Sequence, residues 1–324
     1  MKIGLKTKDM TLSIAKELQA RLTKSKISYE ELYGILQQSS KNQTSYTDTK
    51  SAHKNPHKST GKSSVVKSAK KSVGKNLGQD FGAKSSLDFA QGFAKDFGTR
   101  DFGKDFDIEE AYLQVELLRA QGLPLESSGD TYFLAHNELS WREQEFCFVD
   151  IETTGSKPQE HQIIEIGAIK WKNGKILGEF SELIHAYFIP ETIVEITQIT
   201  PKMLENARKE REVLRDFREF LAQSVFVAHN VGFDYGFVSV AMEQAGLYKL
   251  LNPKLCTIDL ARRTILAKRY SLQYLNEFLG INTPTSHRAY ADALTALKVF
   301  EISLLSLPKS VCTTQDLIDF SMTY

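Results

Sequence analysis

Two carboxylates at the end of an apolar run constrain this chain more than any other feature. The run over residues 146–149 leads into Asp150 and Glu152, and a Thr-Thr-Gly turn follows at 153–155. Successive side chains of a strand point to opposite faces, so Asp150 and Glu152 share one face. Carboxylates gathered at a strand end provide the oxygen ligands that hard divalent cations prefer. The sequence therefore predicts a sheet with an acidic cation site at one strand end.

Two later blocks each combine a histidine with an aspartate at short spacing. They read His229-Asn230-x-x-Phe233-Asp234 and His287-x-x-x-x-Asp292. Each lies at the start of a helix-like pattern, so both blocks can bring a carboxylate toward the strand end.

The pattern of strands and helices between residues 145 and 308 predicts one α/β domain. Asn173-Gly174 is a strong hairpin signal between two strand-like runs. Alternating helices and strands after an antiparallel start imply a mixed sheet with helices on its faces. We expect strands at 146–151, 162–171, 175–184, 225–228 and 255–258, and helices at 201–206, 209–223, 233–245, 259–267, 271–279 and 287–306.

In this order, the three blocks resemble the exonuclease motifs of the DEDD superfamily, and most specifically the proofreading epsilon-subunit family of bacterial DNA polymerase III. The segments 163–168, 199–204 and 256–262 also resemble that family. His287 stands five residues before Asp292, as in the histidine branch of the superfamily. Gln198 departs from the glycine that relatives often have there. The resemblance covers residues 145 to about 306 and implies a ribonuclease H-like fold.

The resemblance and the chemistry of phosphodiesters together assign roles to five residues. Two divalent cations, Mg²⁺ or Mn²⁺, are expected to lower the pKa of the attacking water and to stabilise the leaving oxygen. We assign Asp150, Glu152 and Asp292 to one ion, with Asp150 bridging and Asp234 supporting the second. His287 is the expected general base, because imidazole exchanges protons near neutral pH.

Six further residues are candidates for binding the terminal nucleotide. The backbone amides of the turn after the first strand could contact it, and the second block could contribute side chains, although its residues could equally be structural. The candidates are Thr153, Thr154, Gly155, His229, Asn230 and Phe233.

The first 140 residues divide into three segments by composition. Residues 1–40 contain helix-like stretches, and Ser28 followed by Glu31 is a capping box. Residues 41–107 are rich in Lys, then in Phe and Gly, and we expect them to be disordered. Residues 108–140 read as a helix and a hairpin.

Together with residues 1–40, they resemble a winged-helix-like module that the insertion interrupts. Such a module would bind nucleic acid or a partner; the alternative is a helical cap on the main domain. The basic tract could neutralise phosphates or serve only as a solvated linker.

The C-terminal residues 309–324 loosely resemble the peptides that bind bacterial sliding clamps. Gln315, Ile318 and Phe320 fall at the spacing Gln-x-x-aliphatic-x-Phe. The alternative is a tail that packs on its own domain.

The sequence thus predicts a 3′–5′ exonuclease that hydrolyses phosphodiesters at DNA 3′ ends in replication proofreading or repair. An exoribonuclease that trims RNA 3′ ends and an inactive nucleic-acid-binding or clamp-binding adaptor are the alternatives. The expected partners are single-stranded or frayed DNA 3′ ends, the polymerase alpha subunit and the sliding clamp. No apolar stretch is long enough to span a membrane, so a cytoplasmic protein is expected.

Overall fold

A computed structural model describes residues 13–36, 108–283 and 287–322. The chain divides into two compact units. Of the described residues, the larger unit contains 13–27, 115–127, 132–283 and 287–322, and the smaller contains 28–36, 108–114 and 128–131. The expected disordered insertion at 41–107 and the basic tract within it lie outside the described residues.

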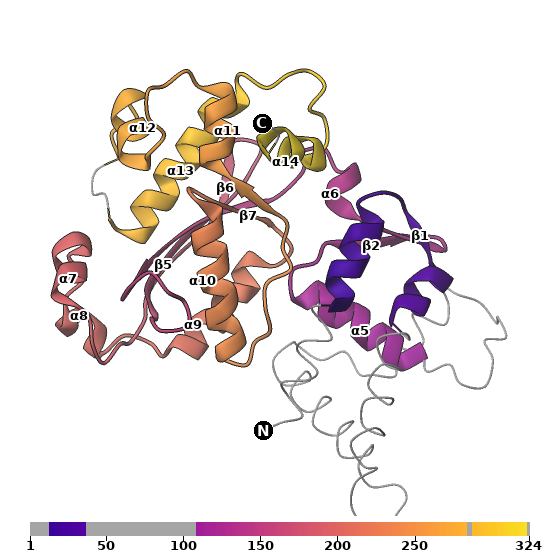
Figure 1. Ribbon diagram of the computed structural model, residues 1–324, viewed down its shortest axis with the longest axis horizontal. Coiled ribbons are helices and arrows are strands. Elements are labelled where there is room, and N and C mark those ends of the chain that lie inside the picture. Colours follow the sequence, from indigo (N-terminus) through magenta and orange to yellow (C-terminus); the bar gives the residue numbers. More distant parts are fainter. Residues whose placement is uncertain (1–12, 37–107, 284–286, 323–324) are drawn as a thin grey trace, which may run out of the picture. The chain divides into compact units, whose positions relative to one another are not determined.

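The larger unit contains a five-stranded mixed sheet with helices packed against it (Figure 1). Its strands hydrogen-bond in the order β6-β5-β4-β7-β8. The first three strands pair antiparallel, and β4, β7 and β8 run parallel to one another. The predicted mixed sheet is confirmed. The strands are β4 (Phe146–Thr153), β5 (Ile163–Lys172), β6 (Lys175–Leu183), β7 (Val225–Ala228) and β8 (Lys254–Cys256).

The hairpin between β5 and β6 turns at the predicted dipeptide. Asn173 and Gly174 have φ values of 46° and 81°. Two consecutive positive φ angles are those of a type I′ turn, whose twist matches that of the strands it joins. The turn sets the pairing of Lys172 with Lys175, although the register shifts between Lys170 and Trp171.

Side chains of β4 alternate between two cores, one on each face of the sheet. Cys147 and Val149 pack with helices α9 (Glu210–Leu221) and α10 (Val231–Gln244). Phe146 and Phe148 point the other way and pack against helix α13 (Ala289–Leu304), where their rings each lie 5.1 Å from that of Phe300. Asp150 and Glu152 continue this second set of positions, so the strand directs both carboxylates to the α13 face.

Between residues 145 and 308, the remaining helices follow the predicted pattern with shifts at their ends, except for α7 (Glu191–Thr197), which the sequence did not predict. Helix α7 is rich in β-branched residues, which have low helix propensity. It forms because Ile193 and Val194 pack against a core that contains Ile164 and Leu204. The helices are α7 (Glu191–Thr197), α8 (Pro201–Glu205), α11 (Thr257–Thr264) and α12 (Leu272–Phe278).

The N-terminal elements occur in the order that a winged-helix module would have. Residues 13–22 and 29–36 are helical, and β1 (Ile27–Ser28) lies between them. Helix α5 (Ile108–Ala120), strands β2 (Leu125–Ser128) and β3 (Thr131–Leu134) and helix α6 (Ala135–Glu138) follow, and the strands hydrogen-bond in the order β1-β3-β2. The capping box is present: the Ser28 amide donates to Glu31 at 2.8 Å, and the Glu31 amide donates to the Ser28 hydroxyl at 3.2 Å. A nucleic-acid-binding role for this module stays a prediction.

The chain beyond residue 308 is not a free tail, because helix α14 (Thr314–Met322) packs on the sheet domain. The Thr314 amide donates to the carbonyl oxygen of Leu139, and the Trp141 indole donates to that of Val311. Leu317 is fully buried. The packed alternative is therefore the one that the structure shows. Among the helices of the described ranges, none combines the length and apolar character needed to cross a membrane.

The start of α13 touches β5 at Gly167, which pairs with Asp150 on β4. A Cβ atom at Gly167 would lie 2.1 Å from the Tyr290 nitrogen and 2.2 Å from the Ala289 carbonyl carbon. Both neighbours are backbone atoms and cannot rotate away. Glycine at this position therefore sets how closely α13 approaches the strand end.

We expect Gly167→Ala to displace the start of α13 and to lower the free energy of unfolding by about 1–3 kcal/mol, as overpacking does. Urea unfolding measures this. Gly236→Ala is the matched control, since a Cβ on this helical glycine meets nothing within 4 Å and alanine favours a helix. Equal stability of the two variants would contradict the steric explanation.

Candidate active site

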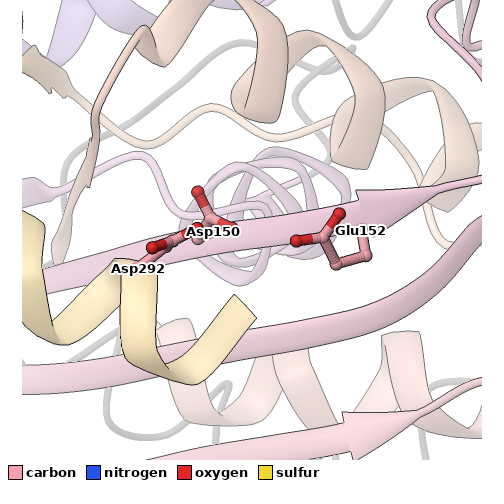
Figure 2. A group of neighbouring side chains, drawn as sticks. All are labelled: Asp150, Glu152 and Asp292. Atoms are coloured by element: carbon pink, nitrogen blue, oxygen red, sulfur yellow. The ribbon is translucent and has the colours of Figure 1, made fainter. Parts of the chain in front are cut away.

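Three carboxylates meet at the end of β4. Asp150 and Glu152 come from the strand, and Asp292 comes from the first turn of α13 (Figure 2). One oxygen from each of the three lies within 4.8 Å of the others. The sequence predicted this grouping, and the crossing of α13 over β5 produces it.

Asp234, the fourth predicted carboxylate, lies on α10 and is 4% exposed. Its charge is close enough to raise the pKa of Asp150. It is not one of the three residues whose oxygens lie within 4.8 Å of one another. The expectation that Asp234 supports a second ion stays a prediction.

Burial raises the pKa of all four carboxylates, and repulsion from neighbouring carboxylates adds to the shift at Asp150, Glu152 and Asp292. Burial raises the pKa of Asp150 well above its usual range, and the charges of the neighbouring carboxylates add to the shift. Burial, with repulsion from Asp292, raises the pKa of Glu152 to about 8. Burial raises the pKa of Asp234 to about 7 and also raises that of Asp292. A divalent cation would offset this repulsion, and the all-oxygen donor set fits such an ion.

We expect the metal-free protein to lose stability as the pH rises from about 5 to 8. Groups whose folded-state pKa is raised hold their protons more tightly when folded. Their stabilising contribution is therefore present at low pH and is lost as the pH passes about 7 for Asp234 and about 8 for Glu152. The expected loss is on the order of 2 kcal/mol. Urea unfolding in EDTA across this range measures it, with saturating Mn²⁺ as the comparison. A free energy of unfolding that rises with pH in EDTA would contradict the raised pKa values of Asp234 and Glu152.

A fifth carboxylate, Glu165, lies beside the four and was given no role from the sequence. It is 2% exposed and is the strand partner of Glu152. Its oxygens accept hydrogen bonds from the Arg288 guanidinium and from the Ala289 amide. The signal in the sequence was a lone Glu inside the apolar run 163–168, where a charge needs a partner. Glu165 and Arg288 also line a cavity of about 490 Å³.

His287 lies two residues before α13, and its side chain is exposed. Its backbone has a φ of 66°, in the left-handed region, and its amide donates to Asp292 Oδ2 at 3.0 Å. The bond links the candidate base directly to one of the three grouped carboxylates.

The turn after β4 makes internal hydrogen bonds. The Thr154 amide donates to the Gln162 carbonyl at 2.9 Å, so this amide has a partner within the protein. The Thr153 hydroxyl donates to the Gly155 carbonyl at 2.8 Å. Roles for Thr153, Thr154 and Gly155 in nucleotide binding stay predictions.

The second block has the contacts of the structural alternative. His229 interacts through Nδ1 with the Thr257 hydroxyl and through Nε2 with the Tyr270 carbonyl, each at 2.8 Å. Burial lowers its pKa to about 4, so it is neutral at pH 7. Asn230 is the residue before α10 with a φ of 86°, and Phe233 packs on the α9–α10 side of the sheet.

The clamp-like residues of α14 also have internal contacts. Ile318 is 6% exposed within the core. The Gln315 side-chain amide donates to the Asp319 carboxylate, and the Arg263 guanidinium lies 4.2 Å from the centre of the Phe320 ring. A partner that needs an extended peptide would therefore have to release α14.

Comparisons with known proteins find relatives of the sheet domain. Residues 147–300 match the Exonuclease family model (RNase_T). A DNA polymerase III subunit epsilon of Aquifex aeolicus is 36% identical over 157 residues, which are 48% of this chain and 78% of that protein. A PolC-type DNA polymerase III of Thermotoga petrophila is 40% identical over 164 residues, which are 50% of this chain and 12% of that much longer protein. E. coli Exonuclease I in complex with a dT13 oligonucleotide superposes with a TM-score of 0.45 at 18% identity, over 50% of this chain and 41% of that one.

The sheet order and the carboxylates from β4 and α13 define a ribonuclease H-like nuclease domain. The chain belongs to the Exonuclease family, among relatives named as epsilon subunits and PolC-type forms of DNA polymerase III. The match covers the sheet domain, and the first 140 residues lie outside it.

Proposed function

We propose that the chain is a metal-dependent 3′–5′ exodeoxyribonuclease that removes nucleotides from DNA 3′ ends in proofreading or repair. The observation that supports this most is the grouping of Asp150, Glu152 and Asp292 within 4.8 Å, in a domain of the Exonuclease family. The all-oxygen donor set suits Mg²⁺ or Mn²⁺, which supply an activated water and stabilise the leaving oxygen.

The protein's own residues divide the remaining work. Asp150, Glu152 and Asp292 provide the oxygen ligands, and Asp234 provides a further carboxylate from α10. His287 accepts the proton that water loses as it attacks phosphorus. The hydrogen bond from the His287 amide to Asp292 orients these two residues relative to each other.

DNA is the proposed substrate because the relatives that match are named as DNA polymerases or their subunits. We place the protein in the cytoplasm, where it would act with a replicative polymerase alpha subunit. Sliding-clamp binding through Gln315, Ile318 and Phe320 stays a proposal; it would be supported if Gln315→Ala and Phe320→Ala weakened binding to a purified clamp without unfolding α14.

The test is a time course on matched 5′-labelled DNA and RNA oligonucleotides with Mg²⁺, Mn²⁺ or EDTA. Stepwise shortening of the DNA from its 3′ end, faster than of the RNA and absent in EDTA, is the expected result. Faster shortening of RNA would replace the proposal with an RNA-trimming enzyme. No cleavage of either, in the presence of the polymerase subunit as well, would point to an adaptor.

A further inference from the structure

Glu165 makes a dense set of hydrogen bonds to the residues that follow His287. The Arg288 Nε donates to both Glu165 oxygens, at 3.2 and 3.1 Å, and Arg288 Nη2 donates to Oε1 at 2.7 Å. The Ala289 amide donates to Oε2 at 3.0 Å. Bidentate arginine–carboxylate pairs are strong and directional. This set of bonds attaches the start of α13 to strand β5.

Arg288 and Ala289, the residues that Glu165 holds, lie in the sequence between His287 and Asp292. Arg288 is the residue immediately after His287, and its carbonyl oxygen accepts the Asp292 amide in the first turn of α13 at 3.1 Å. The His287 amide in turn donates to the Asp292 carboxylate. A shift of Arg288 would therefore move the imidazole and the carboxylate together.

His287 has a backbone conformation that needs external support. A φ of 66° in a residue with a Cβ costs about 1–2 kcal/mol, and such conformations persist where the surroundings over-determine them. Among the described residues, the hydrogen bond from its own amide to Asp292 and the Arg288 side chain held by Glu165 constrain this backbone conformation.

The same bonds give Glu165 a role different from that of its neighbours. Both of its oxygens already accept hydrogen bonds from a cation and an amide, and a buried charge is tolerated when it is paired in this way. It therefore compensates Arg288, whereas Asp150, Glu152 and Asp292 have oxygens within 4.8 Å of one another.

We propose that Glu165 is a positioning residue that acts through Arg288 and the Ala289 amide to hold His287 and Asp292 in their working geometry. This inference deepens the proposed function and rests on it. Partners of this kind, behind the ligating groups, typically contribute 10–100-fold in metal affinity or activity.

The test compares Glu165→Gln and Arg288→Lys with Glu301→Gln. Lysine keeps the charge of Arg288 and loses the bidentate geometry. Glu301 is the matched control, because it also joins β5 to α13, through Trp171 Nε1 at 2.9 Å, at the opposite end of the helix. The measurements are kcat and KM on a 5′-labelled single-stranded DNA and the Mn²⁺ concentration at the midpoint of the thermal shift.

We expect kcat of both test variants to fall about 10–100-fold, with KM changed by less than about threefold and a higher Mn²⁺ midpoint. Glu301→Gln should keep kcat within about twofold, as a change remote from the site does. If Glu165→Gln does not fold, Arg288→Lys alone decides the matter by the same two readouts.

Two results would overturn the inference: kcat and the Mn²⁺ midpoint unchanged in the test variants, or an equal loss in Glu301→Gln. A wild-type chain that cleaves no nucleic acid would refute the proposed function instead. The Mn²⁺ midpoints of the variants would then still test whether Glu165 positions Asp292.

Discussion

Asp150→Asn is expected to reduce cleavage of DNA by about 10³-fold or more, because cation-assisted stabilisation of the transition state contributes several kcal/mol. Asp150 is the carboxylate whose pKa is affected by every other acidic group of the site, so it stands at their centre. Asparagine keeps the size of the side chain and removes the charge. The measurement is single-turnover cleavage of a 5′-labelled oligonucleotide in Mn²⁺.

The same variant should be more stable than the wild type in EDTA and should lose the thermal shift caused by Mn²⁺. Neutral asparagine removes repulsion with Asp234, Asp292 and Glu152. Asp216→Asn is the control, because Asp216 lies on α9 and forms ion pairs with Arg208 and Arg215. This substitution should change neither the stability in EDTA nor the thermal shift caused by Mn²⁺. An active Asp150→Asn variant would refute the cation site.

His287→Gln is expected to reduce cleavage by about 10²–10⁴-fold, the usual contribution of a general base. Because the amide that bonds to Asp292 belongs to the backbone, the variant should keep that contact and its Mn²⁺-induced thermal shift. Loss of activity with metal binding retained would separate the role of His287 from that of Asp150.

His185→Gln is the matched control for this variant. Its ring makes a hydrogen bond to the Leu204 carbonyl through Nδ1 at 3.0 Å. It is not one of the clustered residues Asp150, Glu152 and Asp292. We expect a loss of activity smaller than tenfold, within the range of a single lost hydrogen bond. If His287→Gln lost no more activity than this control, another group would have to accept the proton.

The chemistry of the site could be predicted because it depends on short-range order in the chain. Strand alternation places Asp150 and Glu152 on one face, and the structure directs both to α13. The spacing of Asp292 places it in the first turn of a helix. The hairpin at Asn173-Gly174 and the capping box of Ser28 with Glu31 are equally local, and both are present.

Contacts between distant segments could not be predicted in this way. Helix α7 was missed because its β-branched residues disfavour a helix until Ile193 and Val194 pack on a core assembled from elsewhere. The C-terminal residues loosely resemble clamp-binding peptides, and the sequence left open whether they pack on their own domain. The burial of Leu317 and Ile318 shows that they form a packed helix. The hydrogen bond from the Thr154 amide to the Gln162 carbonyl likewise depends on where the chain returns after the turn.

The sequence by itself determined the class of fold, the acidic strand end and the identity of the residues around it, because each depends on periodicity or on spacing within a few residues. Only the tertiary structure decided that Glu165 belongs to the site. Its partners, Arg288 and Ala289, lie more than 120 residues further along the chain. They reach Glu165 because Gly167 lets the start of α13 approach the backbone of β5. A close approach of this kind leaves no periodic signal in the sequence, because it depends on how helix α13 packs against strand β5. The local residue pattern of either segment alone does not contain that information.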